Sequence, residues 1–423
     1  MKLRKYFLWI SLILFLTAVF GGFQNVDLLW KIGLVAGFSS LAIGVGCLKS
    51  LEVYQYTFWI IAAVFSGLLF PETFLNIGCL DLRNKWLILI IIQLVMFGMG
   101  TQMSIKDFTG IRKSGKGVLV ALLGQFTIMP IIGFIIAKTF GFDAEIAAGI
   151  VLIGSCSSGL ASNVMTYIAK GDLVLSVTVT AISTITAPIM TTFLMKVFAG
   201  TFIEIDVLNM MMSIVKIVLV PLSAALVHDA LKTYEPKVQI KIHYLAIISS
   251  IWLLIAVIFW NSFKLVDGST SVILFEILNF ICGAFVVGVL YHLLYKLNTK
   301  IDAFMPYFSM FGIVYFTLVT TAAGSEHLLE IGGLLFLAAI IHNTSGYLFG
   351  YWLSRASGLD KKQSQTIAFE VGLQNGGMAS GLAGSMGKLA TLGLAAAVFS
   401  PWMNISGSLL ANYWRRMREK LEN

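Results

Sequence analysis

The sequence predicts an all-α, polytopic membrane protein whose two halves carry matching interrupted helices. Hydrophobic residues make up 58% of the 423 residues and charged residues only 12%, with a mean hydropathy of +0.89. A soluble domain is about one quarter charged, so this chain has too few polar residues to cover a large core in water. Much of its surface is therefore expected to face lipid. This composition argues against a nucleic-acid-binding module, although the net charge is +8.

Fourteen apolar stretches follow one another along the chain, each close to the ~20 residues that cross a bilayer. The first follows a basic N-terminus and lacks a small-residue cleavage site, so we interpret it as a retained helix and not as a cleaved signal peptide. The loops are too short to fold as separate domains. The predicted spans are 6–22, 28–48, 54–71, 86–103, 115–139, 144–169, 172–199, 208–231, 243–262, 271–295, 304–323, 330–353, 362–385 and 389–413.

The distribution of Lys and Arg supports this layout and gives it an orientation. With the N-terminus in the cytoplasm, 21 of the 29 basic residues fall in cytoplasmic segments, seven fall outside, and Lys216 lies within a span. Cytoplasmic loops of membrane proteins carry such an excess of Lys and Arg. The sequence therefore predicts a multi-pass protein of the inner (plasma) membrane with both termini in the cytoplasm.

Two of the spans contain residues that oppose a continuous helix near the middle of the bilayer. The first carries Gly, Ser and Asn residues over 154–163, and the second carries Gly, amide and Ser residues over 370–381. Gly weakens a helix, and Ser and Asn compete for its backbone hydrogen bonds. Freed backbone groups are tolerated in hydrocarbon only where protein buries them or where they line a cavity. We therefore expect both helices to be broken at a functional site.

The two interrupted spans also resemble each other. Gly141-Phe142-Asp143 precedes the first and Gly358-Leu359-Asp360 precedes the second, at an offset of 217 residues. In the predicted layout the first span starts outside and the second inside, as in the inverted repeats of secondary transporters. The alternative is a pair of Gly-rich helices packed through small residues. That alternative does not explain a carboxylate and amides at the same depth.

Glu370 lies about nine residues into its predicted helix, whereas nearly all other acidic residues lie at span ends or in loops. A charge at this depth is costly, so we interpret Glu370 as part of a functional site. Protonation of Glu370 and an ion pair with Lys216 stay open as alternatives. Lys216 could equally contact a substrate carboxylate or extend toward the membrane surface.

Oxygen-bearing residues in the broken spans and their neighbours are the candidate ligands of an ion. Ser176 and Thr180 stand four residues apart, so their hydroxyls face one side of a helix. Hydroxyl, amide and carbonyl oxygens with a single carboxylate suit a hard monovalent cation better than zinc or copper. Na⁺ is the expected ion, and H⁺ carried by Glu370 is the alternative. The candidates are Ser162, Asn163, Ser176, Thr180, Gln125, Glu370, Gln374 and Asn375, with the carbonyls of Val371 and Leu373.

At these residues the sequence resembles the bile acid:sodium symporter family. The motifs that carry the resemblance are residues 125–130, 154–167, 176–180, 370–375 and 404–408, and the similarity covers about 54–232 and 304–418. The resemblance implies a ten-helix core, in which a panel domain faces a core domain that holds two broken, crossing helices. It implies a secondary transporter of a small organic anion in the lipid bilayer, with two Na⁺ ions and no enzymatic activity.

The resemblance also implies a role for each candidate residue. One sodium ion would bind Ser162, Asn163, Ser176, Thr180 and Glu370. A second would bind Gln125, Glu370, Gln374 and the carbonyls of Val371 and Leu373. The organic anion would contact Asn375 and Asn404.

Four helices lie outside the ten-helix core that the resemblance implies. Residues 1–53 would form two extra N-terminal helices, and residues 233–303 two inserted helices. The first repeat and the start of the second would occupy 54–232, and the remainder of the second repeat with the C-terminus would occupy 304–423. Bacterial members that bind bile salts carry a His before the C-terminal Asn, where this chain has Met403. The identity of the anion and the oligomeric state stay open.

Other functions are disfavoured by what the sequence lacks. It contains no P-loop, so an ion gradient and not ATP hydrolysis is the expected driving force. It contains no Ser/His/Asp set and no paired carboxylates at depth, so a membrane enzyme is disfavoured. A proton-coupled carrier, a uniporter and a membrane sensor that binds a ligand without transport stay open.

Overall fold

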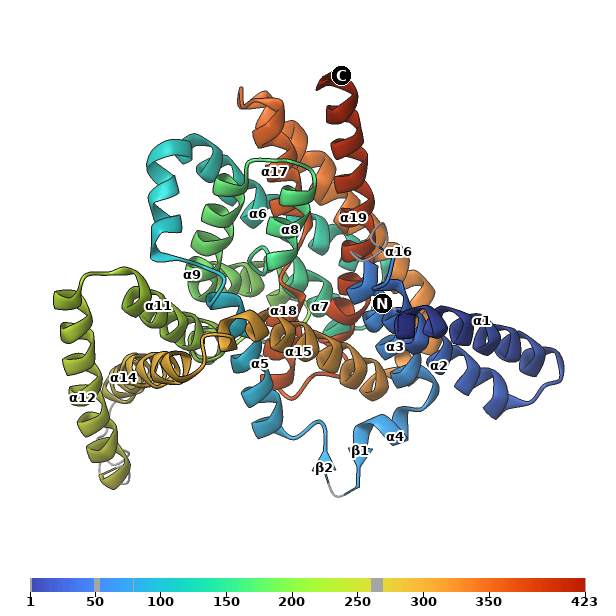
Figure 1. Cartoon of the computed structure of the whole chain (residues 1–423), viewed down its shortest axis with the longest axis horizontal. Helices are drawn as coiled ribbons and strands as arrows, with labels where there is room; N and C mark the ends of the chain where they lie inside the picture. The colour runs from blue at the N-terminus through green and yellow to red at the C-terminus, as the bar shows by residue number, and fades with distance from the viewer. Residues whose placement is uncertain (1, 49–53, 79, 260–268, 423) are drawn as a thin grey trace.

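The computed structural model describes residues 2–48, 54–78, 80–259 and 269–422. Helices form nearly all of this part of the chain, as Figure 1 shows. The named strands among these residues are β1 (Asn76–Ile77) and β2 (Leu80–Asp81), which pair antiparallel. The predicted all-α fold is confirmed.

The N-terminal part begins with a helical hairpin. Its two helices approach closely at Gly33, which has no side chain. A Cβ there would lie 2.8 Å from the Cβ of Ala18 on the opposite helix. Asn84 caps the later helix α5, its Oδ1 accepting a hydrogen bond from Trp86 N at 2.9 Å. The elements are α1 (Lys2–Phe23), α2 (Asp27–Val45), α3 (Gln55–Leu69), α4 (Pro71–Leu75), α5 (Lys85–Gly100), η2 (Ile105–Gly110) and α6 (Ile111–Phe140).

The middle part contains the first broken span and a π-helical turn. The turn, η4, joins α10 to α11 without ending the span. The elements are α7 (Ala144–Ser155), α8 (Leu160–Ile168), α9 (Leu173–Phe198), η3 (Ala199–Thr201), α10 (Val207–Ile214), η4 (Val215–Leu219) and α11 (Val220–Thr233).

The C-terminal part contains the pair of helices predicted to be inserted and the second broken span. The elements are α12 (Pro236–Ile258), α14 (Ser269–Leu297), α15 (Ile301–Ala323), α16 (Ser325–Ala356), α17 (Lys361–Gly372), α18 (Gly376–Ser385) and α19 (Leu394–Glu422). The last helix begins at Leu394, five residues after the predicted start at 389, because residues 386–393 form turns after α18.

Each of the fourteen predicted spans coincides with a helix or a broken pair of helices. Ten helices in the described part of the chain are long and apolar enough to cross a membrane, and the shorter α3 and α5 match two further spans. Spans 144–169 and 362–385 correspond to α7 with α8 and to α17 with α18. The end of predicted span 243–262 lies in residues 260–262, outside the described residues. The protein is a multi-pass membrane protein.

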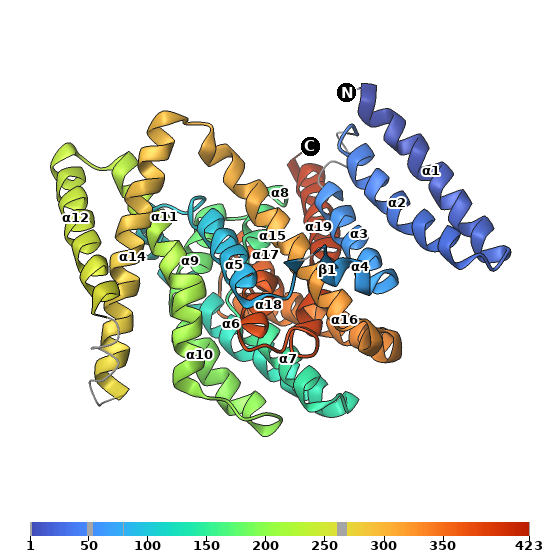
Figure 2. The ribbon, with the colours of Figure 1, turned by 90° about the horizontal axis from the view of Figure 1, so that it is seen from below.

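The four helices that the sequence analysis places outside a ten-helix core lie at two opposite sides of the molecule (Figure 2). Helices α1 and α2 pack together and α2 packs against α3, whereas α12 and α14 pack together and against α11. Figure 2 shows the first pair on the right and the second pair on the left, with the broken helices between them. The additional helices therefore extend the molecule sideways and leave the central site to the others.

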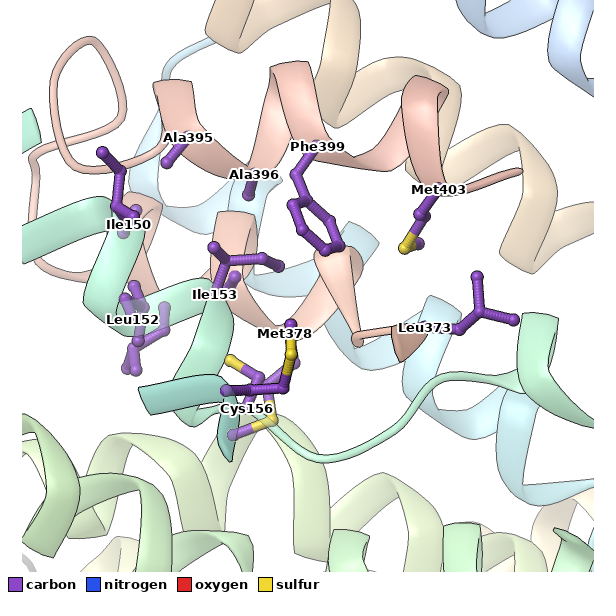
Figure 3. Packing of buried hydrophobic residues seen from close by; sticks show 14 of the residues in the cluster. Ile150, Leu152, Ile153, Cys156, Leu373, Met378, Ala395, Ala396, Phe399 and Met403 are labelled. Carbon is purple, nitrogen blue, oxygen red and sulfur yellow. The ribbon is translucent and has the colours of Figure 1, made fainter. Parts of the chain in front are cut away.

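A hydrophobic core surrounds the breaks. Ile153 of α7, Phe369 of α17 and Phe399 of α19 are each at most 1% exposed and belong to one cluster. Figure 3 shows Ala396 and Phe399 on the side of α19 that faces Ile153, with Cys156 and Met378 among the same apolar side chains. This packing keeps water away from the backbone at the first break.

Candidate functional site

The first break consists of the short extended segment between α7 and α8. Cys156 ends α7 with extended angles (φ −72°, ψ 164°), and Gly159 precedes α8 with extended angles (φ −104°, ψ 166°). Gly159 suits this place because a Cβ there would lie 3.0 Å from the carbonyl oxygen of Gln374. The break is shorter than the Gly- and Ser-rich stretch that predicted it, since Leu160 to Asn163 already belong to α8.

The second break lies between α17 and α18. Leu373 ends α17 with extended angles (φ −103°, ψ 101°), and Asn375 caps α18 by accepting a hydrogen bond from Met378 N at 3.0 Å. Asn343 of α16 donates its Nδ2 to the freed carbonyl of Gly372 at 2.8 Å. The amide of Asn343 therefore replaces a hydrogen bond that the helix loses at its end.

The two breaks satisfy each other's backbone. Ser158 and Gln374 form an antiparallel bridge, in which Gly159 N donates to Leu373 O at 3.2 Å and Asn375 N donates to Ser157 O at 2.9 Å. These pairs replace helical hydrogen bonds at a depth where water cannot do so. The two broken helices thus meet at their breaks, as the sequence predicts.

Glu370 lies in the last turn of α17 and is fully buried. Its carboxylate accepts hydrogen bonds from Ser158 Oγ at 2.7 Å and Thr180 Oγ1 at 3.0 Å through Oε2. Its Oε1 accepts from Ser176 Oγ at 2.5 Å. We call Glu370 with Ser158, Ser162, Asn163, Ser176 and Thr180 the hydroxyl cluster.

The hydroxyl cluster holds more close oxygen pairs than its hydroxyl hydrogens can bridge. Ser176 Oγ also lies 2.8 Å from Asn163 Oδ1, and Thr180 Oγ1 lies 3.2 Å from the same atom. Each hydroxyl has one hydrogen, so it donates either to Glu370 or to Asn163. Ser162 Oγ donates to Gly159 O at 2.8 Å and lies 3.3 Å from Thr180 Oγ1. A small cation among these oxygens, a proton on Glu370, or a turn of the Asn163 amide that points Nδ2 at Ser176 and Thr180 would supply the missing attraction.

Gln125 and Gln374 form a second polar group, which we call the amide pair. Gln125 Nε2 donates to Gln374 Oε1 at 2.6 Å and to Cys156 O at 2.7 Å. Gln374 Nε2 donates to Val371 O at 2.6 Å. Among the described residues, the hydrogen bonds of Glu370 go to the hydroxyl cluster and not to the amide pair. The residues implied for a second ion are therefore adjacent, but their groups already bond to one another.

A cavity of about 270 Å³ adjoins the breaks. One wall comes from α3, α5 and α15, and the other from α8, α18, α19 and the second break. The lining includes the predicted substrate ligands Asn375 and Asn404 together with Met403. The lining of this cavity contains no Asp, Glu, Lys, Arg or His among the described residues, and most of it is apolar.

Two hydrogen-bond donors at this cavity are buried without a partner. They are Nδ2 of Asn375 and the hydroxyl of Tyr56 on α3, as judged from the described part of the chain. A buried donor without a partner is costly, so a ligand that accepts from it gains affinity. Helices α8 and α18 also begin at this cavity, and helix N-termini attract anions. The site can thus receive an anion without a basic side chain.

The comparisons with known proteins agree with the motifs. The sequence pattern of the Sodium Bile acid symporter family matches residues 89–269. The uncharacterized sodium-dependent transporter YocS of Bacillus subtilis (strain 168) is 30% identical over 363 residues, which cover 86% of this chain and 91% of that protein. The chain belongs to the sodium bile acid symporter family. The human ileal sodium/bile acid cotransporter is 27% identical over 310 residues, covering 72% of this chain and 70% of its own length.

Membership of the symporter family confirms the predicted family and makes this protein a transporter and not an enzyme. The structure also corrects one alternative, because Lys216 is not paired with Glu370. The Lys216 side chain instead lines a separate pocket beside α14. The sequence analysis missed three residues, Ser158, Asn343 and Tyr56. Ser158 lies inside the predicted break, whereas the other two carry no local signal of their role.

Proposed function

We propose that this protein is a sodium-coupled symporter of a small organic anion that works by alternating access. The observation that carries the proposal is the hydroxyl cluster, in which three hydroxyls contact a fully buried carboxylate that forms no ion pair with any described residue. A sodium ion there would bind Glu370 and the oxygens of Ser162, Asn163, Ser176 and Thr180. The structure adds Ser158, whose Oγ contacts the same carboxylate at 2.7 Å.

A second sodium ion would bind at the amide pair. Its ligands would be the side-chain oxygens of Gln125 and Gln374 and the carbonyls of Val371 and Leu373, with Glu370 near by. The hydrogen bonds between Gln374 and Val371 O and between Gly159 N and Leu373 O occupy two of these oxygens. Binding here therefore requires the amides to turn, which makes this site the weaker of the two. The expected stoichiometry is two ions per anion.

The organic anion would bind in the cavity of about 270 Å³. Its charged group would accept hydrogen bonds from Asn375 Nδ2, from Asn404, and from backbone N–H groups at the starts of α8 and α18. Its apolar body would lie against Met310 and Ile313 of α15. The lack of a basic residue among the described lining favours a monoanion over a dianion, because helix termini supply only partial positive charge. Met403 and the cavity volume favour a ligand smaller than a bile salt.

Transport would arise from relative motion of two groups of helices. Helix α15 packs against α3 and α5, and α5 packs against α11, whereas α6–α9 contact α16–α19. We assign the first group to the panel domain and the second to the core domain, with the repeats over 54–232 and 304–423 and the extra helices over 1–53 and 233–303. Because the cavity has one wall from each group, movement of one against the other would open it to alternate sides. The Lys and Arg bias supports a plasma-membrane location with both termini in the cytoplasm.

Binding of Na⁺ alone tests the ion site without knowledge of the substrate. We expect NaCl to raise the Tm of the purified protein above its value in choline chloride at equal ionic strength, because a ligand stabilises the state that binds it. A screen of keto acids, pantoate-like acids, sulfonates and steroids in NaCl and in choline chloride then identifies the anion. Equal anion affinity in both salts would refute sodium coupling.

A proton on Glu370 is the second candidate for the coupling ion, since a protonated Glu370 would donate a hydrogen bond to a neighbouring oxygen of the hydroxyl cluster. Uptake into proteoliposomes separates the candidates. A sodium gradient at uniform pH should drive accumulation, whereas a pH gradient in choline should not. Accumulation driven by the pH gradient would show that the proton, and not sodium, is the coupling ion. Saturable binding without counterflow would instead favour a sensor.

A further inference from the structure

A second polar pocket lies away from the breaks, between α10 with η4 and the inserted helix α14. Its volume is about 440 Å³. The α10 side contributes Asn209, Met212, Ser213 and Lys216, whose spacing of three and four residues places them on one helix face. The α14 side contributes Glu276, Asn279 and Phe280. Helix α14 packs closely on α11 but makes no comparable contact with α10, so the two sides diverge there.

The pocket opens within one leaflet of the membrane. Lys216 lies nine residues after the start of α10 at Val207, which places it roughly 14 Å along the helix at 1.5 Å per residue. Glu276 lies seven residues after Ser269, or roughly 10 Å along α14. Both helices start on the same side because the chain crosses once in α11 and once in α12 between them. The face of α14 that carries Glu276 continues through Phe280 to Val287, which is exposed and faces acyl chains in a membrane.

The charges in this pocket have no partner among the described residues. Within residues 2–48, 54–78, 80–259 and 269–422, neither Lys216 nor Glu276 forms an ion pair or a side-chain hydrogen bond. A lysine and a glutamate at this depth are each costly to leave unpaired. They lie on opposite walls, so a ligand that carries both charges would satisfy both.

The neutral side chains of the pocket add hydrogen-bond donors to the charges of Lys216 and Glu276. Asn279 accepts a hydrogen bond on Oδ1 from Trp252 Nε1 at 2.9 Å, which leaves its Nδ2 as a donor. Asn209 is tied to Asp206, donating its Nδ2 to Asp206 Oδ2 at 2.6 Å. Lys216, Asn279 and the Ser213 hydroxyl thus offer donors to an anionic group, and Glu276 offers an acceptor to a cationic one. Met212 and Phe280 supply apolar contact between them.

The backbone at this place is also unusual. Lys216 belongs to the π-helical turn η4, and π-turns occur frequently at functional sites. Gln93 of α5 donates its Nε2 to the carbonyl oxygen of Lys216 at 3.2 Å. The hydrogen bond from Gln93 therefore fixes the backbone of the turn, while the Lys216 side chain is exposed and lines the pocket.

We propose that this pocket binds the headgroup of a phospholipid that carries a phosphate and a primary ammonium, as ethanolamine phospholipids do. Lys216, Ser213 and Asn279 bind the phosphate, and Glu276 binds the ammonium. The acyl chains lie along Phe280 and Val287 of α14. The lipid joins the inserted helix to α10 where the two helices diverge. This site is separate from the anion cavity and does not depend on the proposed transport function.

Lipid-dependent stability tests this assignment. The purified protein is mixed with ethanolamine, choline or glycerol phospholipids of identical acyl chains, and the Tm is measured. We expect the ethanolamine lipid to raise the Tm by a few degrees more than the other two. The choline headgroup offers no N–H to Glu276, and the glycerol headgroup offers no cation. An equal shift with all three lipids would overturn the proposal.

Two variants locate the effect. Lys216→Met and Glu276→Gln should each remove the preference for the ethanolamine lipid. The matched controls Lys241→Met on α12 and Glu330→Gln on α16 change exposed residues outside the pocket and should retain it. Retention of the preference in both pocket variants would place the lipid elsewhere and refute the site. If a pocket variant fails to fold, the comparison of lipids on the unaltered protein still decides.

A water-soluble headgroup shows whether the ligand of this pocket is a phospholipid or a free zwitterion of the same chemistry. Phosphoethanolamine without acyl chains should compete weakly and give less than half of the lipid's Tm shift, because it lacks the contacts with α14. A full shift from phosphoethanolamine alone would overturn the assignment to a lipid and make the pocket a site for a soluble zwitterion.

Discussion

The hydroxyl cluster and the amide pair lie side by side between the same broken helices, yet they satisfy their polar atoms differently. In the hydroxyl cluster, Ser176 and Thr180 each face two acceptors with one hydrogen. In the amide pair, Gln125 and Gln374 have donors as well as acceptors and bond to each other and to carbonyls. The first group also contains the carboxylate of Glu370, which attracts a cation, whereas a cation must displace hydrogen bonds in the second group. This difference predicts that the two proposed sodium sites are unequal in affinity.

Removal of the carboxylate should have the largest effect. Glu370→Gln replaces the one charged ligand by a neutral amide whose donors oppose a cation. We expect sodium affinity, measured by Tm titration with NaCl, to fall by about 10²-fold or more, as for other buried charges that lose their partner. Glu330→Gln on α16 is the matched control and should leave it unchanged. A Glu370→Gln protein with normal sodium response would refute the site and the comparison together.

Loss of one hydroxyl ligand should have the next largest effect. Ser158→Ala removes the hydrogen bond to Glu370 Oε2 and one oxygen from the cluster. We expect sodium affinity to fall by roughly 10-fold, since a hydrogen bond to a charged group contributes ~1.5–3 kcal/mol. Thr186→Val is the control, because among the described residues its hydroxyl bonds only to carbonyls of its own helix α9. If both variants behave alike, Ser158 supports the fold and not the ion.

A substitution in the amide pair should change the cooperativity of sodium-dependent anion uptake more than its midpoint sodium concentration. Gln125→Ala removes a ligand of the second site but none from the hydroxyl cluster. We expect the sodium dependence of anion uptake to lose its cooperativity, with a change in midpoint of less than about 10-fold. Gln239→Ala, on α12 and away from both breaks, is the control. An effect of Gln125→Ala as large as that of Glu370→Gln would remove the distinction between the two sites.

The smallest effect is expected at the cavity wall. Tyr56→Phe removes a donor that has no partner among the described residues and keeps the ring. We expect the affinity of the transported anion to fall by about 3- to 10-fold with sodium affinity unchanged, because one neutral hydrogen bond contributes ~1 kcal/mol. Tyr54→Phe is the control, since its hydroxyl bonds to Asn412 and lies outside the cavity lining. A change in sodium affinity alone would place Tyr56 with the ions.

Much of the candidate site could be predicted because its residues conflict with their surroundings. Glu370 in an apolar span and Gly and Ser residues in the middle of two spans are costly wherever the chain places them. The helical period also places Ser176 and Thr180 on one face without further information. The motifs added the roles of Gln125, Gln374 and Asn404. These signals are local, so one sequence is sufficient to find them.

The sequence by itself determined that the chain lies in a membrane, that two of its helices break, and which oxygens are available at the breaks. The tertiary structure decided which groups meet. It pairs the backbone of residue 158 with that of 374, directs Asn343 to the carbonyl of Gly372, and separates Lys216 from Glu370. Partners more than two hundred positions apart, such as Ser158 and Glu370, share no periodicity that a sequence can reveal. Their distance is fixed only when the helices that carry them pack.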